Sequence, residues 1–160
     1  MQWKQCNKAN APLVFHELNR MRFQEPGRIT SICPEKTVLL EKKGKEREGR
    51  FDFLVQGNKK NLGIEVLQRP SQGKMREKLA YAKEVDEFVF VLPKESLGLY
   101  KKTKTNGIKR IAHKKYLSKE FSNPKLKVWL VDCANGKIAE KGPFGKVFEV
   151  RQSFNSCSEY

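Results

Sequence analysis

The sequence lacks several features that would point to common classes of protein. It has no run of about eighteen apolar residues, so we expect no membrane-spanning helix and no membrane partner. Residues 1–15 contain no continuous apolar segment, so we expect no secretory signal. A Walker loop and a G-x-S-x-G motif are both absent, which argues against ATP use and against a serine hydrolase.

Cysteine and histidine are scarce as well. The four cysteines are scattered singly without C-x-x-C spacing, and the two histidines, His16 and His113, have no partner at a metal-binding spacing. We therefore expect no zinc site, and the cysteines should be free thiols in a reducing cytoplasm.

Acidic residues are few compared with basic ones. The chain has 33 Lys and Arg against 18 Asp and Glu, a net charge of +15. Such an excess favours a polyanionic partner, because each neutralised phosphate releases counterions and adds affinity. Nucleic acid is favoured over an anionic membrane, since no basic amphipathic anchor with large apolar residues stands out. Charge alone does not separate an enzyme from a structural protein of a ribonucleoprotein.

The most basic stretch covers residues 100–119. Its cations are predicted to bind the phosphate backbone without reading base sequence. These predicted nucleic-acid-binding residues are Lys101, Lys102, Lys104, Lys109, Arg110, Lys114 and Lys115.

Periodicity and turn residues predict an α/β protein with a single domain over residues 1–160. A core over about 10–95 has the order α-β-β-β-α-β, and a basic segment with further strands follows over 96–160. This order predicts a central mixed sheet flanked by helices. The predicted helices start near residue 11 and cover 72–84, and the predicted strands are 37–40, 50–56, 61–68, 87–93, 127–131 and 146–150.

Two acids interrupt the second and third of these strands. Alternation in RFDFLVQ puts Phe51, Phe53 and Val55 on one face and Asp52 on the other. A hairpin turn centred between residues 58 and 59 gives partner numbers that add up to 117, which sets Asp52 opposite Glu65. Their Cβ atoms would then be roughly 4.5–5.5 Å apart. A turn one residue longer would instead put the acids on opposite faces.

Two like charges at this spacing repel each other, and burial makes the repulsion more costly. Either one acid takes up a proton or a cation binds between them, and Mg²⁺ or Mn²⁺ suits oxygen ligands best. The alternative is that both acids are solvated on an exposed face. A third acid, Glu17, interrupts the apolar stripe of the first helix; it either joins the pair or forms an ion pair with Arg20 or Arg22.

Helix-borne Glu17, strand-borne Asp52, Glu65 on the next strand and a following helix resemble the PD-(D/E)xK nuclease superfamily. This restriction-endonuclease-like fold includes archaeal Holliday junction resolvases and repair nucleases. The resemblance covers about residues 10–95. It implies that Asp52 and Glu65 bind Mg²⁺ or Mn²⁺ and that Glu17 assists. Of the nucleic acids we favour DNA over RNA as the partner, although the sequence alone does not distinguish them. A homodimer is one expected form, because cutting both strands often takes two copies.

The sequence departs from the family pattern at two positions. Phe51 replaces the proline, and Leu67 replaces the lysine two residues after the second acid. Some members take this amine from the following helix, where Lys74 and Lys78 are the candidates here. The sequence therefore predicts a metal-dependent DNA endonuclease. The alternative is a catalytically inactive nucleic-acid-binding module with the same fold.

Overall fold

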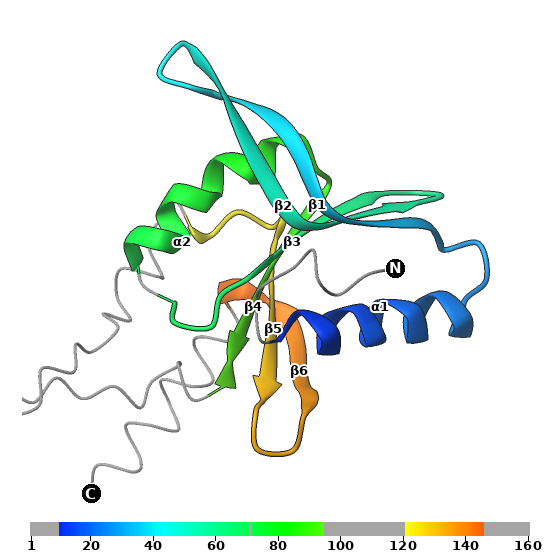
Figure 1. The fold of residues 1–160 in the computed structure, drawn as a ribbon. Coiled ribbons are helices and arrows are strands. Elements are labelled where there is room, and N and C mark those ends of the chain that lie inside the picture. The colour runs from blue at the N-terminus through cyan, green and yellow to red at the C-terminus, as the bar shows by residue number, and fades with distance from the viewer. Residues whose placement is uncertain (1–9, 71, 95–120, 146–160) are drawn as a thin grey trace, which may run out of the picture.

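The structure, a computed structural model, describes residues 10–70, 72–94 and 121–145, which form an α/β arrangement of two α-helices and one six-stranded mixed sheet (Figure 1). The predicted order α-β-β-β-α-β is confirmed. Within these ranges no helix is long and apolar enough to cross a membrane. The elements are α1 (Ala11–Gln24), β1 (Ile29–Lys42), β2 (Lys45–Gly57), β3 (Asn61–Val66), α2 (Gln72–Lys78), the 3₁₀ helix η2 (Leu79–Glu84), β4 (Glu87–Pro93), β5 (Leu126–Asp132) and β6 (Lys137–Pro143).

The strands lie in the sheet in chain order. β1, β2 and β3 form an antiparallel meander, β3, β4 and β5 are parallel, and β6 pairs antiparallel with β5. The connection from β3 to its parallel neighbour β4 contains α2 and η2, as expected for a parallel crossover.

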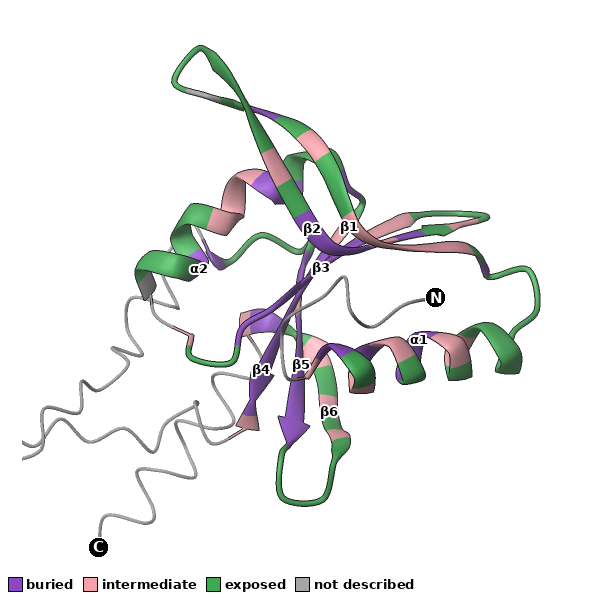
Figure 2. Ribbon diagram, in the orientation of Figure 1, coloured by how far each residue is buried: buried purple, intermediate pink, exposed green. Residues whose placement is uncertain are grey.

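The sheet separates two hydrophobic cores. The α1 core contains Val14 and Leu18 of α1 packed on Phe53, Ile64 and Val66. The α2 core contains Met75 of α2 and Tyr81 and Ala82 of η2, packed on Leu67 and Phe90. The central strands β4 and β5 are buried along nearly their whole length (Figure 2). Such burial on both faces is typical of parallel strands covered by helices.

Several elements differ in extent from the prediction. β1 begins at Ile29 rather than near residue 37, because polar residues and Pro34 hide its periodicity. The charged segment 41–49 is mostly strand, with the turn at Lys43 and Gly44. The second helix changes to a 3₁₀ helix after Lys78. The predicted edge strand 146–150 lies outside the described residues, and β6 pairs with β5 instead.

The predicted face of Phe51 is wrong. Phe51 packs in the α2 core, whereas Phe53 packs in the α1 core, so strict alternation fails between them. Glu35, which lies between the partners of Phe51 and Phe53 on β1, has a φ of 54°. A positive φ in a strand is typical of a local irregularity that rotates the neighbouring side chains. The Phe51 ring lies so close to Gly63 that a Cβ there would be 2.4 Å from it.

Candidate functional site

The predicted register of the β2–β3 hairpin is confirmed. The paired residues run from Phe53↔Ile64 to Gln56↔Asn61, and every pair adds up to 117. Asp52 and Glu65 are the next residues along each strand, directly beyond the last pair. The structure therefore places the two acids on adjacent strands, one residue beyond the last pair of the ladder.

Asp52 continues the contact between the two strands with its side chain. Its carboxylate Oδ2 accepts a hydrogen bond of 2.7 Å from the backbone N–H of Val66, the residue that follows Glu65. Asp52 is buried, with 6% of its surface exposed. A buried carboxylate needs such donors, because leaving it unsatisfied is costly. The hydrogen bond fixes the Asp52 carboxylate within one residue of Glu65.

Glu65 lies on the central strand β3 with 2% of its surface exposed. Its neighbours Ile64 and Val66 point into the α1 core, so Glu65 points to the opposite face, which α2 covers. The Nζ of Lys78, at the end of α2, lies 3.3 Å from Glu65 Oε1. The same amine lies 4.8 Å from the centre of the Tyr81 ring, which also holds it in place.

A hollow of about 610 Å³, here called the acid hollow, opens beside Glu65. It lies between the end of β3, the loop after it and α2. Its lining has three cationic and two acidic side chains, so a phosphate group and a cation could bind there together. The residues that line it include Glu65, Leu67, Arg69, Lys74, Glu77 and Lys78.

Leu67, at the position where the resemblance leads us to expect a lysine, is part of the α2 core and is 7% exposed. It therefore contributes packing to the wall of the acid hollow and no charge. Of the two predicted substitutes, Lys78 forms the ion pair with Glu65. Lys74 lines the same hollow, but its Nζ donates a hydrogen bond of 3.3 Å to the backbone carbonyl of Arg69. The geometry thus favours Lys78 over Lys74 as the amine beside the acids.

The structure does not bring Glu17 to the acid pair, which corrects that expectation. α1 packs on the opposite face of the sheet from Glu65. Glu17 forms ion pairs with Arg20 and, at 2.6 Å, with Lys141 of β6. Burial raises the pKa of Glu17, but the hydrogen bonds from Arg20 and Lys141 outweigh it and lower the pKa below its ordinary value. The alternative pairing with Arg20 is the one that the structure bears out.

The two acids of β2 and β3 carry oxygen donors of the kind that a hard divalent cation binds, although of the two only Glu65 lines the acid hollow. Asp52 and Glu65 offer carboxylate oxygens, the ligands that Mg²⁺ and Mn²⁺ prefer. In the part of the chain that the structure describes, no group of three or more His, Cys, Asp or Glu side chains could hold a metal ion. An ion bound by two carboxylates would complete its coordination with water and phosphate oxygens, which is common for Mg²⁺.

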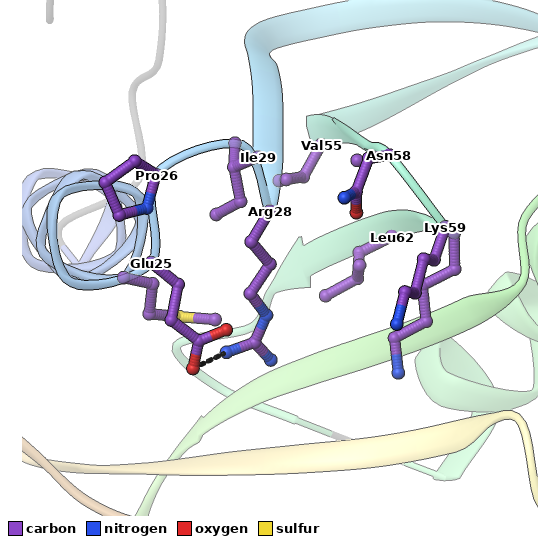
Figure 3. A pocket seen from close by; sticks show the side chains of 11 residues that line it. Glu25, Pro26, Arg28, Ile29, Val55, Asn58, Lys59 and Leu62 are labelled. Carbon is purple, nitrogen blue, oxygen red and sulfur yellow. Dashed lines mark ion pairs between the residues drawn. The ribbon is translucent and has the colours of Figure 1, made fainter.

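A second pocket, of about 390 Å³, lies at the other end of the β2–β3 hairpin (Figure 3). Val55 and Leu62 form part of its apolar wall, and Arg28 and Lys59 lie at its rim. Arg28 pairs with Glu25 at 3.4 Å, and both side chains are exposed. This pocket contains neither acid of the pair.

The remaining predicted site residues cannot be placed relative to the acids. The basic residues of 101–115 and His113 lie outside the described residues. His16 is exposed on α1, away from the acid hollow. Sequence reasoning missed Lys141 as the partner of Glu17 and Arg69 as a residue of the acid hollow. One feature of the sequence could have indicated Arg69 as a site residue: it lies directly before Pro70, at the end of a strand that carries an acid.

Comparisons with protein-family models, with curated proteins and with solved structures find no match for this chain.

Proposed function

We propose that the protein is a metal-dependent nuclease of the PD-(D/E)xK type that hydrolyses phosphodiester bonds in DNA. One observation carries the proposal: the Nζ of Lys78 lies 3.3 Å from Glu65, and Glu65 and Asp52 are the residues directly beyond the last pair of the β2–β3 ladder. Two carboxylates and an amine are the groups that the family uses. Here the amine comes from the helix after the second acid strand. The restriction-endonuclease-like order of elements supports the same proposal.

Asp52 and Glu65 would hold Mg²⁺ or Mn²⁺, which supplies Lewis acidity and a more nucleophilic water at neutral pH. The Val66 N–H keeps the Asp52 carboxylate in position for this role. Lys78, held between Glu65 and the Tyr81 ring, would donate to a phosphate oxygen and stabilise the negative charge that grows in the transition state. Arg69 and Lys74 would orient the phosphate backbone across the acid hollow.

The buried Leu67 favours a second candidate function, a catalytically inactive nucleic-acid-binding module. In this case the Lys78–Glu65 ion pair would only neutralise a buried carboxylate. The net charge of +15 supports both candidates equally. The two are therefore distinguished by cleavage and not by binding.

The decisive experiment compares wild type with Glu65→Gln and Asp52→Asn on branched, flapped, duplex and single-stranded DNA, with Mg²⁺, Mn²⁺ or EDTA. We expect wild type to cut at least one substrate with metal, and both variants to lose cleavage by about a hundredfold or more while binding is nearly unchanged. Glu17→Gln is the matched control, since it neutralises a buried glutamate on the other face and should leave cleavage intact.

Calorimetric titration of Mn²⁺ should give binding heat with wild type and little with Asp52→Asn. Metal-independent cleavage, or cleavage that survives Glu65→Gln, would refute the two-acid mechanism. Binding of DNA without cleavage of any substrate would favour the inactive module.

A further inference from the structure

The longest part of the β1–β2 hairpin is a two-stranded ribbon that extends away from the rest of the sheet (Figure 1). β2 pairs with β3 only from Phe53 onward, whereas its pairing with β1 continues from Phe51 to Lys45. The ribbon ends in a tight turn at Lys43 and Gly44, whose φ angles are 55° and 73°. Two successive positive φ angles are typical of the hairpin turn that matches strand twist, so the turn fixes the register of the ribbon.

Charges are sorted between the two faces of this ribbon. Arg47 lies opposite Leu40, and Lys45 and Gly49 share that face by alternation. The opposite face carries Glu46, Glu48 and also Arg50, whose charge is paired with Glu35, and Glu46 lies directly across from Glu41. Like charges directly opposite one another destabilise a sheet. The stability of the fold alone would therefore not favour this separation of acidic and basic residues onto opposite faces of the ribbon.

The cationic face is on the same side of the sheet as the acid hollow. Leu40 belongs to the α2 core together with Leu67 and Tyr81. A Cβ on Gly49 would come within 2.6 Å of the Tyr81 hydroxyl, so this face of the ribbon rests on η2. Lys45 and Arg47, both exposed, continue the same face beyond this contact toward the turn.

The ribbon lies at a fixed distance from the acids. Arg47 and Lys45 are five and seven residues from Asp52 along β2. At about 3.3 Å per residue, these side chains start roughly 17–23 Å from the site. Successive base pairs of a duplex are about 3.4 Å apart, so this span corresponds to roughly five to seven base pairs.

On the basis of the proposed function, we infer that this ribbon binds the phosphate backbone of duplex DNA roughly five to seven base pairs to one side of the cleaved bond. Lys45 and Arg47 make the contacts, and the glutamate face points away from the DNA. A two-stranded ribbon fits the major groove of a duplex. Residues 36–50 contain no aromatic residue, whereas binding of single strands relies on aromatic stacking.

The test measures binding in EDTA, so it does not depend on cleavage. Lys45→Ala/Arg47→Ala should lower the affinity for a 30-base-pair duplex roughly tenfold to a hundredfold at about 0.1 M salt. It should also reduce the slope of log K against log salt by about 1.8, the value for two lost phosphate contacts. Glu46→Ala/Glu48→Ala removes the opposite charge from the other face and should change binding less than twofold.

Duplexes that extend by different numbers of base pairs to one side of the cleavage site provide a second test. With fewer than about five base pairs on one side of the site, wild type should bind no better than Lys45→Ala/Arg47→Ala. Equal and opposite effects of the two double variants would show that only net charge counts and would overturn the inference. An unchanged affinity of Lys45→Ala/Arg47→Ala, or an equal loss with single strands, would overturn it as well. If the binding results are as expected but wild type cuts no substrate, the proposed nuclease activity is refuted and the proposed role of the ribbon in DNA binding stands.

Discussion

Each face of the sheet carries a buried glutamate that pairs with a lysine, but the surroundings of the two acids differ. On the α1 face, Glu17 joins a helix to the edge strand β6 through Lys141 and also pairs with Arg20. Lys141 is itself held 4.4 Å from the centre of the Trp129 ring. On the α2 face, Glu65 lies on a central strand beside a hollow of about 610 Å³, and its contact with Lys78 is longer, at 3.3 Å.

This difference separates a structural acid from a candidate catalytic one. Glu17 has two cationic partners, Arg20 within α1 and Lys141, which joins α1 to β6, so a substrate would have to break existing ion pairs to reach it. Glu65 has a second acid on the neighbouring strand and a cavity with cations in its wall. A buried acid beside an open cavity lined by charged groups is typical of a functional site.

The largest expected effect is on the α2 face. Lys78→Met keeps the apolar stem of the side chain but removes the amine beside Glu65. We expect cleavage to slow by about a hundredfold or more, the usual scale for losing a transition-state stabiliser, with DNA affinity nearly unchanged. Lys74→Met, from the same hollow, should have a smaller effect, since Lys74 bonds to the Arg69 carbonyl. Single-turnover rates at saturating protein measure both.

A second substitution tests whether Lys78 supplies the missing amine. Leu67→Lys places an amine on the same face of β3 as Glu65. In the Lys78→Met background it should restore part of the lost rate, while in wild type it should bring no gain. Equal rates for Lys78→Met and wild type, with both proteins folded, would remove Lys78 from the mechanism.

A smaller effect is expected on the α1 face, and on stability only. Glu17→Gln leaves Lys141 and Arg20 without their carboxylate partner. Hydrogen bonds to charged groups contribute about 1.5–3 kcal/mol, and solvent screens the share of the half-exposed Arg20. We therefore expect the free energy of unfolding to fall by about 1–2 kcal/mol in urea denaturation. A loss of cleavage in a folded Glu17→Gln protein would return Glu17 to the site.

The sequence was informative where local chemistry decides the structure. The Asn58–Lys59 turn sets the hairpin register, so the pairing of β2 with β3 from Phe53↔Ile64 to Gln56↔Asn61 could be predicted from residue numbers alone. Helical spacing after Pro70 likewise placed Lys78 within reach of the sheet. Both predictions depend on residues that are close in the chain, where turn type and periodicity leave few alternatives.

Predictions failed where contacts between distant parts of the chain determine the structure. A helical stripe shows that α1 is buried on one side, but not which face of the sheet it covers, so the sequence left Glu17 open between the acid pair and an ion pair with Arg20 or Arg22. Its partner Lys141 is 124 positions away and has no local signal. The irregularity at Glu35 acts on Phe51 through the neighbouring strand, which alternation within β2 does not reveal.

The smallest expected effect is the pH dependence of the ion pairs that Glu17 forms with Arg20 and Lys141. Because its partners lower the pKa of Glu17 below 4.5, the unfolded chain takes up a proton at a higher pH than the folded protein does. The contribution of Glu17 is therefore fully present above about pH 4.5 and is lost as the pH falls through the lower, folded pKa. The stability difference between wild type and Glu17→Gln should shrink in urea titrations as the pH falls below 4.5. Lys141→Met removes one of the groups that lower this pKa, so it should weaken the pH dependence while the Met side chain still packs on Trp129. A difference that does not shrink as the pH falls below 4.5 would show that the ion pairs of Glu17 add nothing to folding, and the contrast between the two buried glutamates would then rest on the acid hollow alone.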